Sequence, residues 1–439
     1  MYSEHFSINN IPFGVASTSS HPTRSVVTRF EDNVIFLETL ASAGTLSSIS
    51  ESTLKTFSEV STQLLSATWL YIDIQKPTVN AYAALPKSEH QAVRSAIQDL
   101  LRNGTSNLPA QSSIPISDVT LHLPIKIGAF SDYSCSREHM LNCAEAIFGK
   151  REAPPGFEYF PPGYHGRASS IVVSGTSIVR PKGQFRNAEK KVVYGPTEKL
   201  DYELEIGAVI GKGNKLGERI KIENVDDHLF GIVILNDWSG KVIPRYMNFS
   251  ETDKIARDIQ NLEMNPLGPL NSKSFSTTIS PWIITLDALE PFRAPRPQRE
   301  SDIPLAPYFQ DPHPLPTYAF NLTSSVKRKG SSKFVTMCDT QFSSICWTLR
   351  DLVAHQTVNG CNLDTGDILA TGTISGNAPG SNACQLETAS KGGIKITTDD
   401  GGSEQLVYFN DGDTISITGF MGPGVGFGDC VGTILPANE

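Results

Sequence analysis

The sequence predicts a mostly β protein with some α-helix, divided into two parts. Its 439 residues include 35 glycines and 28 prolines, which is typical of a chain with many turns between strands. From Thr120 onward, short runs rich in β-branched and aromatic residues alternate with Gly, Pro or Asn, as strands and turns do. Hydrophobic residues make up 39% of the chain, and the length suggests two or three domains at roughly 100 to 200 residues each.

Charge and hydropathy exclude several function classes. The 37 basic and 46 acidic side chains give a net charge of −9, which argues against a nucleic-acid partner. The longest apolar runs, such as residues 230–235, fall far short of the roughly 18 to 20 residues that a bilayer span needs. The start, MYSEHFSINN, has neither a basic nor an apolar signal region. We therefore expect a soluble, cytoplasmic protein with no membrane partner.

Residues 1–118 predict a small α+β or barrel-like module. Two strand-like runs, VVTRF and NVIFL, are separated by a turn at Asp32 and indicate a hairpin. A helix is expected to start with a capping box at Ser88 and to stop before Gly104. The segment SNLPAQSSIP (106–115) is expected to be a linker.

Residues 119–439 are expected to be dominated by antiparallel strands. The candidate strands are SSIVVSG, LDYELEIGAVIG, HLFGIVILNDW, TISPWIITL, FNLTSSV, GGIKITT and DTISITGF. One helix is predicted before Gly360, and its apolar face comprises Phe342, Ile345, Cys346, Leu349, Leu352 and Val353.

The cysteines are predicted to be reduced. They are odd in number, widely scattered and without a C-x-x-C pair, whereas a disulfide framework or a zinc site needs paired spacing. We interpret them as packed thiols. The seven are Cys135, Cys143, Cys338, Cys346, Cys361, Cys384 and Cys430.

Three carboxylates mark a candidate cation site. Glu203 and Glu205 fall on one face of a predicted strand, about 6.5 to 7 Å apart, although this is also the pattern of a solvent-facing polar face. The apolar run GIVILND, typical of a strand buried on both faces, ends at Asp237, where a carboxylate needs a partner or a cation. Converging carboxylates without His or Cys at ligand spacing favour Mg²⁺ or Ca²⁺ over zinc.

Four further residues are candidates for chemistry. Asp132 and His139 are close enough in sequence to share one loop-to-helix site, although a lone His is more often a satisfied surface or core group. Tyr164, in GYHGRASSIVVSG, indicates either a packed turn or a loop that presents groups to an anion. Thr373, next to a glycine, is either structural or a hydroxyl that a ligand approaches closely. Neither loop has the motif of nucleotide binding, and no serine-hydrolase elbow occurs.

Taken in order, these phrases resemble the fumarylacetoacetate hydrolase family, and the resemblance spans nearly the whole chain. The motifs that carry it are IPFGV (11–15), SDYSCSREH (131–139), PPGYHGRASSIVVSGT (161–176), LDYELEIG (200–207), GIVILNDWS (231–239), ARDIQ (256–260), NPLGPLNSKSF (265–275), SPWI (280–283), VNGCNL (358–363), LATGTISG (369–376) and the closing GFGDCVGTILPA.

The resemblance implies an SH3-like barrel over residues 1–118, a catalytic β-roll domain over residues 119–439, and a homodimer. It implies a divalent cation, Mg²⁺ and/or Ca²⁺, whose ligands by motif position are Asp132, Glu203, Glu205 and Asp237. His139 is implied as general base, with Glu387 as its orienting carboxylate. The implied substrate-binding residues are Tyr164, Arg257, Gln260, Lys273, Thr373 and Ser134, of which Gln260 and Lys273 also complete the oxyanion site.

The implied activity is hydrolysis of the carbon–carbon bond of 4-fumarylacetoacetate to fumarate and acetoacetate, the last step of tyrosine and phenylalanine breakdown. Water must attack one carbonyl and a carbanion must leave, so a divalent ion chelated by the diketone oxygens would act as Lewis acid and template. Two alternatives stay open at this point. One is a family relative that hydrolyses another 1,3-diketo or acylpyruvate substrate, and the other is an inactive dimeric binding protein.

The chain departs from the family pattern at two tyrosine positions, at an arginine and by an insert. Ser134 and Met264 stand where the family commonly has tyrosines, and the arginine expected after the helix of His139 is not clearly present. Residues 240–255 interrupt the phrase NDWSARDIQ. These 16 residues begin with Gly-Lys-Val, which a splice-donor-like GGTAAGGT can encode, and we hypothesise a retained intron. A genuine insert would either loop out at little entropic cost or disrupt the site.

Overall fold

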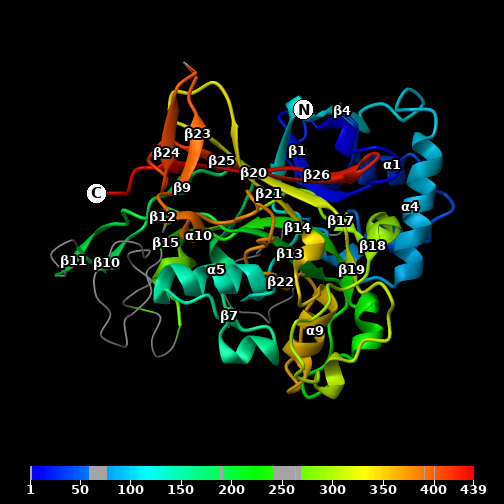
Figure 1. Ribbon diagram of the computed structural model, residues 1–439. Helices are drawn as coiled ribbons and strands as arrows, with labels where there is room; N and C mark the ends of the chain where they lie inside the picture. The colour runs from blue at the N-terminus through cyan, green and yellow to red at the C-terminus, as the bar shows by residue number, and fades with distance from the viewer. Residues whose placement is uncertain are drawn as a thin grey trace, which may run out of the picture.

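The computed structural model describes residues 2–58, 77–187, 191–240, 263, 268–389, 391–399 and 401–439. Within these residues the protein consists mainly of β-sheets, one with eight strands and two with five, together with four two-stranded ladders. The longer helices α4, α5 and α9 lie on the outside of the sheets (Figure 1). The predicted class, mostly β with some α, is confirmed.

The N-terminal part is a five-stranded antiparallel sheet with the strand order β4-β3-β2-β1-β5. The predicted hairpin is present, with Phe30 opposite Asn33 across its turn. Strands and helices of this part are β1 (Phe13–Thr18), β2 (Ser25–Phe30), β3 (Asn33–Phe36), β4 (Ser113–Pro115), β5 (Val119–His122), α1 (Leu37–Ser42), α2 (Glu51–Lys55), α3 (Asn80–Ala83) and α4 (Lys87–Leu101).

Two details of the N-terminal part differ from the prediction. Helix α4 begins at Lys87, directly after Pro86, so Ser88 lies inside the first turn and the predicted capping box is wrong. The ring of Pro86 fixes φ at −59°, and the helix starts two residues earlier than a cap at Ser88 implies. The end of the expected linker is a strand, since Ser113–Pro115 pairs with β3, and its backbone groups are satisfied in the sheet.

The eight-stranded sheet is buried on both faces. Every residue of β13 and β14 is buried, as the run GIVILND predicts. Ile232 and Ile234 belong to one hydrophobic cluster and Val233 and Leu235 to the other, because side chains alternate across a strand. In sheet order, the strands are β7 (Gly163–His165), β6 (Phe130–Tyr133), β22 (Ile368–Ala370), β13 (Leu204–Ile210), β14 (Leu229–Asn236), β16 (Thr277–Ile279) and β8 (Ile171–Val173), with β17 (Ile284–Thr285) beside β14.

The N-terminal part shares a hydrophobic core with the eight-stranded sheet. Phe13 and Ile283 exchange backbone hydrogen bonds of 3.0 and 2.8 Å, and the ring centroid of Phe13 lies 6.0 Å from that of Phe230. Val93 of α4 belongs to the same buried cluster as Val233 of β14. One face of the sheet is therefore closed by the N-terminal part.

The other face packs against a five-stranded sheet with the order β21-β20-β25-β26-β9, and Ile232 shares a cluster with Leu322 and Ile417 of that sheet. Its strands are β9 (Ile178–Val179), β20 (Asn321–Lys327), β21 (Val335–Gln341), β25 (Thr414–Gly422) and β26 (Val425–Leu435). The two-stranded ladders are β10 (Lys182–Arg186) with β11 (Val192–Pro196), β12 (Leu200–Asp201) with β15 (Ser239–Gly240), β18 (Arg293–Ala294) with β19 (Thr317–Tyr318), and β23 (Ile394–Thr397) with β24 (Ser403–Leu406).

Helix α9 (Leu349–Thr357) is shorter than predicted. A capping box between Thr348 and Asp351 fixes its start, and Phe342 belongs to a separate 3₁₀ turn. The remaining helices are α5 (Arg137–Phe148), α7 (Asn271–Ser274), α8 (Leu286–Leu289) and α10 (Leu386–Ala389), and the 3₁₀ turns are η1 (Ser3–His5), η2 (Ile116–Asp118), η3 (Pro155–Glu158), η4 (Ala168–Ser170), η5 (Ile222–Asp227), η6 (Glu290–Phe292), η7 (Pro307–Phe309) and η8 (Phe342–Ser344). Among the described helices, none has the length and apolar character of a membrane span.

Candidate active site

The four carboxylates named by the sequence converge at one edge of the central sheet. Asp132 lies in β6, Glu203 just before β13, Glu205 in β13 and Asp237 just after β14. The antiparallel pairing of β13 with β14 places Leu204 opposite Asn236, so the start of one strand meets the end of the other. One oxygen from each of the four side chains lies within 4.8 Å of the others, and all four residues are buried. The solvent-facing alternative for the two glutamates is thus excluded.

The carboxylate cluster fits a cation. Both carboxylate oxygens of Glu205 and Oδ1 of Asp132 are buried without a hydrogen-bond partner, which is costly for groups that carry charge. Burial, followed by repulsion from Asp237, raises the pKa of Asp132 to about 7, and burial with repulsion from Asp132 raises the pKa of Glu205. A donor set made only of carboxylate oxygens suits a hard divalent cation. These residues could therefore hold a metal ion.

Lys273 enters the cluster from helix α7. Its Nζ contacts both Glu203 and Asp237. Burial alone would lower the pKa of Lys273, but these carboxylates, Asp237 foremost, outweigh it and raise the pKa. Glu263 accepts hydrogen bonds from three backbone N–H groups at the start of α7, which fixes the turn that carries the ammonium. Lys273 thus supplies positive charge among the crowded carboxylates.

Asp237 is oriented from two further elements. The hydroxyl of Tyr164, in β7, donates to Asp237 Oδ2 at 2.6 Å, and the hydroxyl of Thr277, in β16, donates to Oδ1 at 3.1 Å. The phenol of Tyr164 therefore faces the carboxylate cluster. Thr277 was not anticipated, since a threonine in an apolar strand is ordinary in sequence.

His139 is held in place by Glu387. The Nδ1 atom of His139 lies 2.7 Å from Glu387 Oε1, and the buried carboxylate also accepts hydrogen bonds from Asn142 at 2.6 Å, Ser375 at 2.5 Å and Asn382 at 2.9 Å. Burial lowers the pKa of His139, but contacts with Cys384 and Glu387 outweigh it and raise the pKa to about 10. When the ring is neutral, a carboxylate on Nδ1 favours the tautomer whose Nε2 can accept a proton.

The histidine pair and the carboxylate cluster are joined through the backbone. Leu204, between the two glutamates, accepts a hydrogen bond from Ile374 N at 2.9 Å and donates to Ala383 O at 3.1 Å. The hydroxyl of Ser136, which caps helix α5, donates to Ser375 O at 2.6 Å. The loop after β22 therefore ties the start of α5 to strand β13.

Thr373 lies in that loop with its hydroxyl buried and without a hydrogen-bond partner. The preceding Gly372 has φ +68°, and a Cβ there would lie 1.9 Å from Tyr133 O, so only glycine allows the loop to approach β6 so closely. Ser134 is half-buried and donates its backbone N–H to Pro162 at 2.8 Å. An unpaired buried hydroxyl at Thr373 is available to a ligand.

Some sequence-predicted residues lie outside the described residues. These are Arg257, Gln260 and Met264, together with the insert beyond Gly240. Arg151, from the segment where the family arginine was sought, is paired with Glu138 at 2.5 Å.

Two cysteines beside His139 were missed by sequence reasoning. All seven cysteines are free thiols. Cys143 Sγ lies 3.6 Å from both ring nitrogens of His139, and a ligand atom of Cys384 lies within 4.8 Å of those of His139 and Glu387. The spacing of four residues between His139 and Cys143 on one predicted helix could have signalled the first contact.

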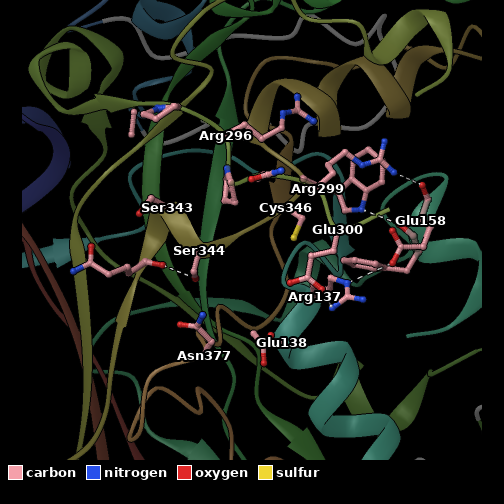
Figure 2. Close-up of a pocket in the computed structure, with 17 residues that line it drawn as sticks. Arg137, Glu138, Glu158, Arg296, Arg299, Glu300, Ser343, Ser344, Cys346 and Asn377 are labelled. Carbon is pink, nitrogen blue, oxygen red and sulfur yellow. Dashed lines mark hydrogen bonds and ion pairs between the residues drawn. The ribbon is translucent and has the colours of Figure 1, made fainter. Parts of the chain in front are cut away.

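A separate cavity of about 480 Å³ opens beside the start of α5. Figure 2 shows Arg137 between Glu158 and Glu300 on one side of it. The guanidinium of Arg299 lies 5.5 Å from the Trp347 ring centroid. Of the described residues that line the cavity, none is His139 or one of the four clustered carboxylates, and its arginines and glutamates largely neutralise one another. We therefore place the chemistry at the carboxylate cluster.

Comparisons with known proteins identify the family of the chain. A sequence profile described as fumarylacetoacetate (FAA) hydrolase C-terminal matches residues 128–435, and one described as fumarylacetoacetase N-terminal matches residues 9–124. The chain is 37% identical to fumarylacetoacetase fahA of Aspergillus fumigatus and 38% identical to the fumarylacetoacetase of Mus musculus, each over 98% of this chain and 96% of the relative. It is 38% identical to that of Oryza sativa subsp. japonica, over 99% and 95%.

Among solved structures, Cg1458 with inhibitor has a similar fold, with a TM-score of 0.50 and 13% identity over 97% of this chain and 100% of that one. Two matched profiles that together span most of the chain, and relatives at more than a third identity over nearly its full length, agree with the motif order read from the sequence. The protein belongs to the fumarylacetoacetate hydrolase family.

Proposed function

We propose that the protein hydrolyses the carbon–carbon bond of 4-fumarylacetoacetate to give fumarate and acetoacetate, the final step of tyrosine and phenylalanine catabolism. The observation that carries the proposal is the buried cluster of four carboxylates joined by backbone hydrogen bonds to a carboxylate-oriented histidine. Full-length similarity to proteins named fumarylacetoacetase supports the same substrate.

His139 acts as the general base. With Nδ1 held by Glu387, Nε2 takes a proton from the water that attacks the fumaryl carbonyl, a role typically worth about 10²- to 10⁴-fold in rate. The same proton then returns to the acetoacetate carbon as the carbon–carbon bond breaks. Asn142, Ser375 and Asn382 keep Glu387 ionised and fixed, so the imidazole does not need to reorient between the two transfers.

A divalent cation held by Asp132, Glu203, Glu205 and Asp237 would supply Lewis-acid stabilisation of the enolate that leaves. Lys273 offers its ammonium to the oxyanion that develops at the attacked carbonyl, and Gln260 is proposed to complete that site. Arg257, Tyr164, Thr373 and Ser134 are proposed to bind the polar groups of the substrate. The buried unpaired hydroxyl of Thr373 supports its part in this set.

We propose Mg²⁺ or Ca²⁺ as the resident ion because the donors are carboxylate oxygens alone. Calorimetric titration of the chelator-treated protein with Mg²⁺, Ca²⁺ and Zn²⁺ tests this assignment. Tight binding of Mg²⁺ or Ca²⁺ that Asp132→Asn removes supports it, whereas binding of Zn²⁺ alone at this site contradicts it.

The decisive assay for the function follows loss of diketone absorbance of fumarylacetoacetate, with added Mg²⁺ and with chelator, on forms with and without residues 240–255. Acetopyruvate serves as the acylpyruvate comparison, because Ser134 stands at a position where the family commonly has tyrosine. Preference for fumarylacetoacetate in at least one form supports the proposal. Turnover of acetopyruvate alone favours the related hydrolase, and no turnover in either form favours the binding protein. Sequencing of the mature transcript decides whether residues 240–255 are a retained intron.

We further propose a cytoplasmic homodimer built from an SH3-like module at residues 1–118 and a catalytic domain at 119–439. Strand β5 begins at Val119 and pairs with β1, so the first strand after this boundary completes the N-terminal sheet. Sedimentation equilibrium of the full chain tests the dimer, and a monomer at micromolar concentration would contradict it.

A further inference from the structure

A thiol lies against the imidazole that the reaction uses. Cys143 follows His139 by one turn of helix α5, and its Sγ lies 3.6 Å from both Nδ1 and Nε2 of the ring. The ring in turn lies 2.7 Å from Glu387. The thiol therefore lies beside an imidazole that a carboxylate orients, and a base close to a cysteine can take its proton as the sulfur attacks. Water is the only nucleophile that hydrolysis requires, so the thiol is additional to the proposed reaction.

Cys143 is also accessible, unlike its neighbour. It is half-buried, whereas Cys384 is 1% exposed and its Sγ lies 3.5 Å from the carboxylate of Glu387. Cys346 and Cys361 are half-buried too, but the contacts of Cys361 are with Asn362 and Gln356. Of these four cysteines, Cys143 is the one that is both partly exposed to solvent and in contact with a histidine ring.

A ligand is expected on this side of the site. The hydroxyl of Thr373 is buried and without a hydrogen-bond partner, and Ser375, two residues further on, donates to Glu387. The segment that fixes the carboxylate of the dyad thus also presents an unsatisfied polar group. A substrate carbonyl approached by water from His139 must lie within a few ångströms of the imidazole, and therefore close to Cys143.

We propose that Cys143 is a covalent modification site for α,β-unsaturated carbonyl compounds bound in the active site. The inference rests on the proposed function, since a fumaryl ligand carries a carbon–carbon double bond conjugated with the carbonyl beside His139. The sulfur–carbon bond forms as the π bond breaks, and its electron pair moves into the enolate of the conjugated carbonyl. The thiol proton, carried by His139, ends on the α-carbon. No group leaves, and no oxidant or reductant is consumed.

The test uses the full-length protein with dimethyl fumarate as the unsaturated probe and dimethyl succinate as its saturated control. Intact mass and peptide mapping follow the adduct over time. We expect one adduct on Cys143, formed at least about tenfold faster than on Cys346 or Cys361, as a neighbouring base activates a thiol. Dimethyl succinate should give none. Equal rates at the three cysteines would overturn the proposal.

Variants separate activation from access. His139→Gln should slow the modification of Cys143 at least about tenfold without changing the rate at Cys346, and Cys143→Ser should lose the fast adduct while Cys346→Ser keeps it. Circular dichroism confirms that each variant is folded. If His139→Gln leaves the rate at Cys143 unchanged, the thiol is merely exposed and the proposal fails.

Protection places the thiol in the ligand pocket. Acetopyruvate, a diketo acid without an isolated fumaryl double bond, should slow the labelling of Cys143 and leave Cys346 unaffected, and absence of protection would overturn the assignment. Dimethyl fumarate reports on Cys143 whether or not the protein turns over fumarylacetoacetate. If the protein does not hydrolyse fumarylacetoacetate but Cys143 is still labelled fast and is protected by acetopyruvate, the proposed substrate is contradicted. The proposal for Cys143 then still stands.

Discussion

The phenol of Tyr164 donates to Oδ2 of Asp237 at 2.6 Å, which links strand β7 to the residue directly after β14. With Thr277 on its other oxygen, Asp237 is an oriented carboxylate. Glu205, in contrast, has both oxygens buried and without a hydrogen-bond partner. The cluster thus contains one carboxylate that protein hydrogen bonds orient, Asp237, and one whose oxygens need a bound ligand as their partner, Glu205.

Replacing Tyr164 should weaken cation binding without unfolding the protein. Tyr164→Phe removes the hydrogen bond that orients Asp237, and the loss of such a supporting contact typically lowers metal affinity about 10- to 100-fold. Calorimetric titration with Mg²⁺ and Ca²⁺ measures the change. Tyr194→Phe, whose side chain is 73% exposed, is the matched control, and an unchanged affinity in Tyr164→Phe would contradict the role of the hydroxyl.

Replacing Glu205 should stabilise the cation-free protein. Burial, then repulsion from Asp132, raises the pKa of Glu205 well above its ordinary value. A carboxyl whose folded pKa is raised contributes stability only at pH values where it is protonated, and that contribution is lost as the pH rises through the folded pKa. Glu205→Gln should therefore add roughly 1 to 3 kcal/mol at pH 7.5 in chelator, and should abolish the stabilisation by Mg²⁺. Scanning calorimetry tests both effects against exposed Glu223→Gln, and a lower melting temperature in chelator would refute the prediction.

Replacing Glu387 should shift the titration of His139. The contacts of Cys384 and Glu387 outweigh burial and raise the pKa of His139 to about 10, so Glu387→Gln should lower that pKa while Asn142 and Ser375 keep a partner at the amide. The turnover number should fall about 10²- to 10⁴-fold. Histidine-resolved NMR titration of the chelator-treated protein checks the pKa. Normal turnover with an unmoved pKa would show that the contact is only structural.

The N-terminal segment should make the protein acid-sensitive through His5. Its ring is 5% exposed, accepts a hydrogen bond from Gly428 N at 3.1 Å, and has its pKa lowered by burial to about 4. Because the unfolded chain then binds more protons, the stabilising contribution is present above the unfolded pKa of about 6.5 and is lost as the pH falls toward 4. We expect a loss of about 1 to 3 kcal/mol over this range.

Denaturation midpoints at pH 7 and pH 5 measure the effect of His5. His5→Asn should reduce the difference between the two midpoints, and the exposed His21→Asn should leave it unchanged. The same pH difference in all three proteins would argue against His5 as its source.

Replacing Gly372 should damage the site more than an equally strained glycine elsewhere. Gly372 and Gly380 both have positive φ, +68° and +81°, but a Cβ meets Tyr133 O at 1.9 Å at the first and nothing within 4 Å at the second. Gly380→Ala should cost about 1 to 2 kcal/mol from backbone strain, and Gly372→Ala considerably more, with loss of activity as Thr373 moves. Chemical denaturation and the hydrolysis assay compare the pair, and similar losses in both would contradict the steric argument.

The sequence allowed the carboxylates to be predicted because each is a local anomaly. Asp237 interrupts an apolar run, and Glu203 and Glu205 alternate with apolar residues. The exact strand boundaries around them could not be predicted, since the strand is interrupted between β12 and β13 and Glu203 lies in the interruption. The alternation of side chains along a strand therefore predicts that both glutamates lie on the same face, but not that Glu203 lies outside the strand.

The environment of Glu387 could not be predicted in the same way. Asn142 reaches it from a position 245 residues earlier, through the packing of α5 against α10, and Cys384 does not stand out in the sequence. Two helix starts differ from the prediction for local reasons: α4 begins directly after Pro86, ahead of the expected cap at Ser88, and the Thr348–Asp351 capping box starts α9 although the apolar periodicity begins earlier, at Phe342. Hydrophobic periodicity thus predicts neither the contacts between distant segments nor the residues at which helices begin.

The backbone hydrogen bonds between Phe13 and Ile283 have a consequence for substitutions in the N-terminal part. This part covers one face of β14, the strand that precedes Asp237, so a change in its core disturbs the same sheet that carries the chemistry. Missense variants such as those at Val93 should lower the amount of working enzyme in a cell without altering the turnover of each surviving molecule. Substitutions in the N-terminal core should therefore lower protein abundance, whereas substitutions in the carboxylate cluster should lower specific activity, and a small molecule that stabilises the fold should rescue the former and not the latter.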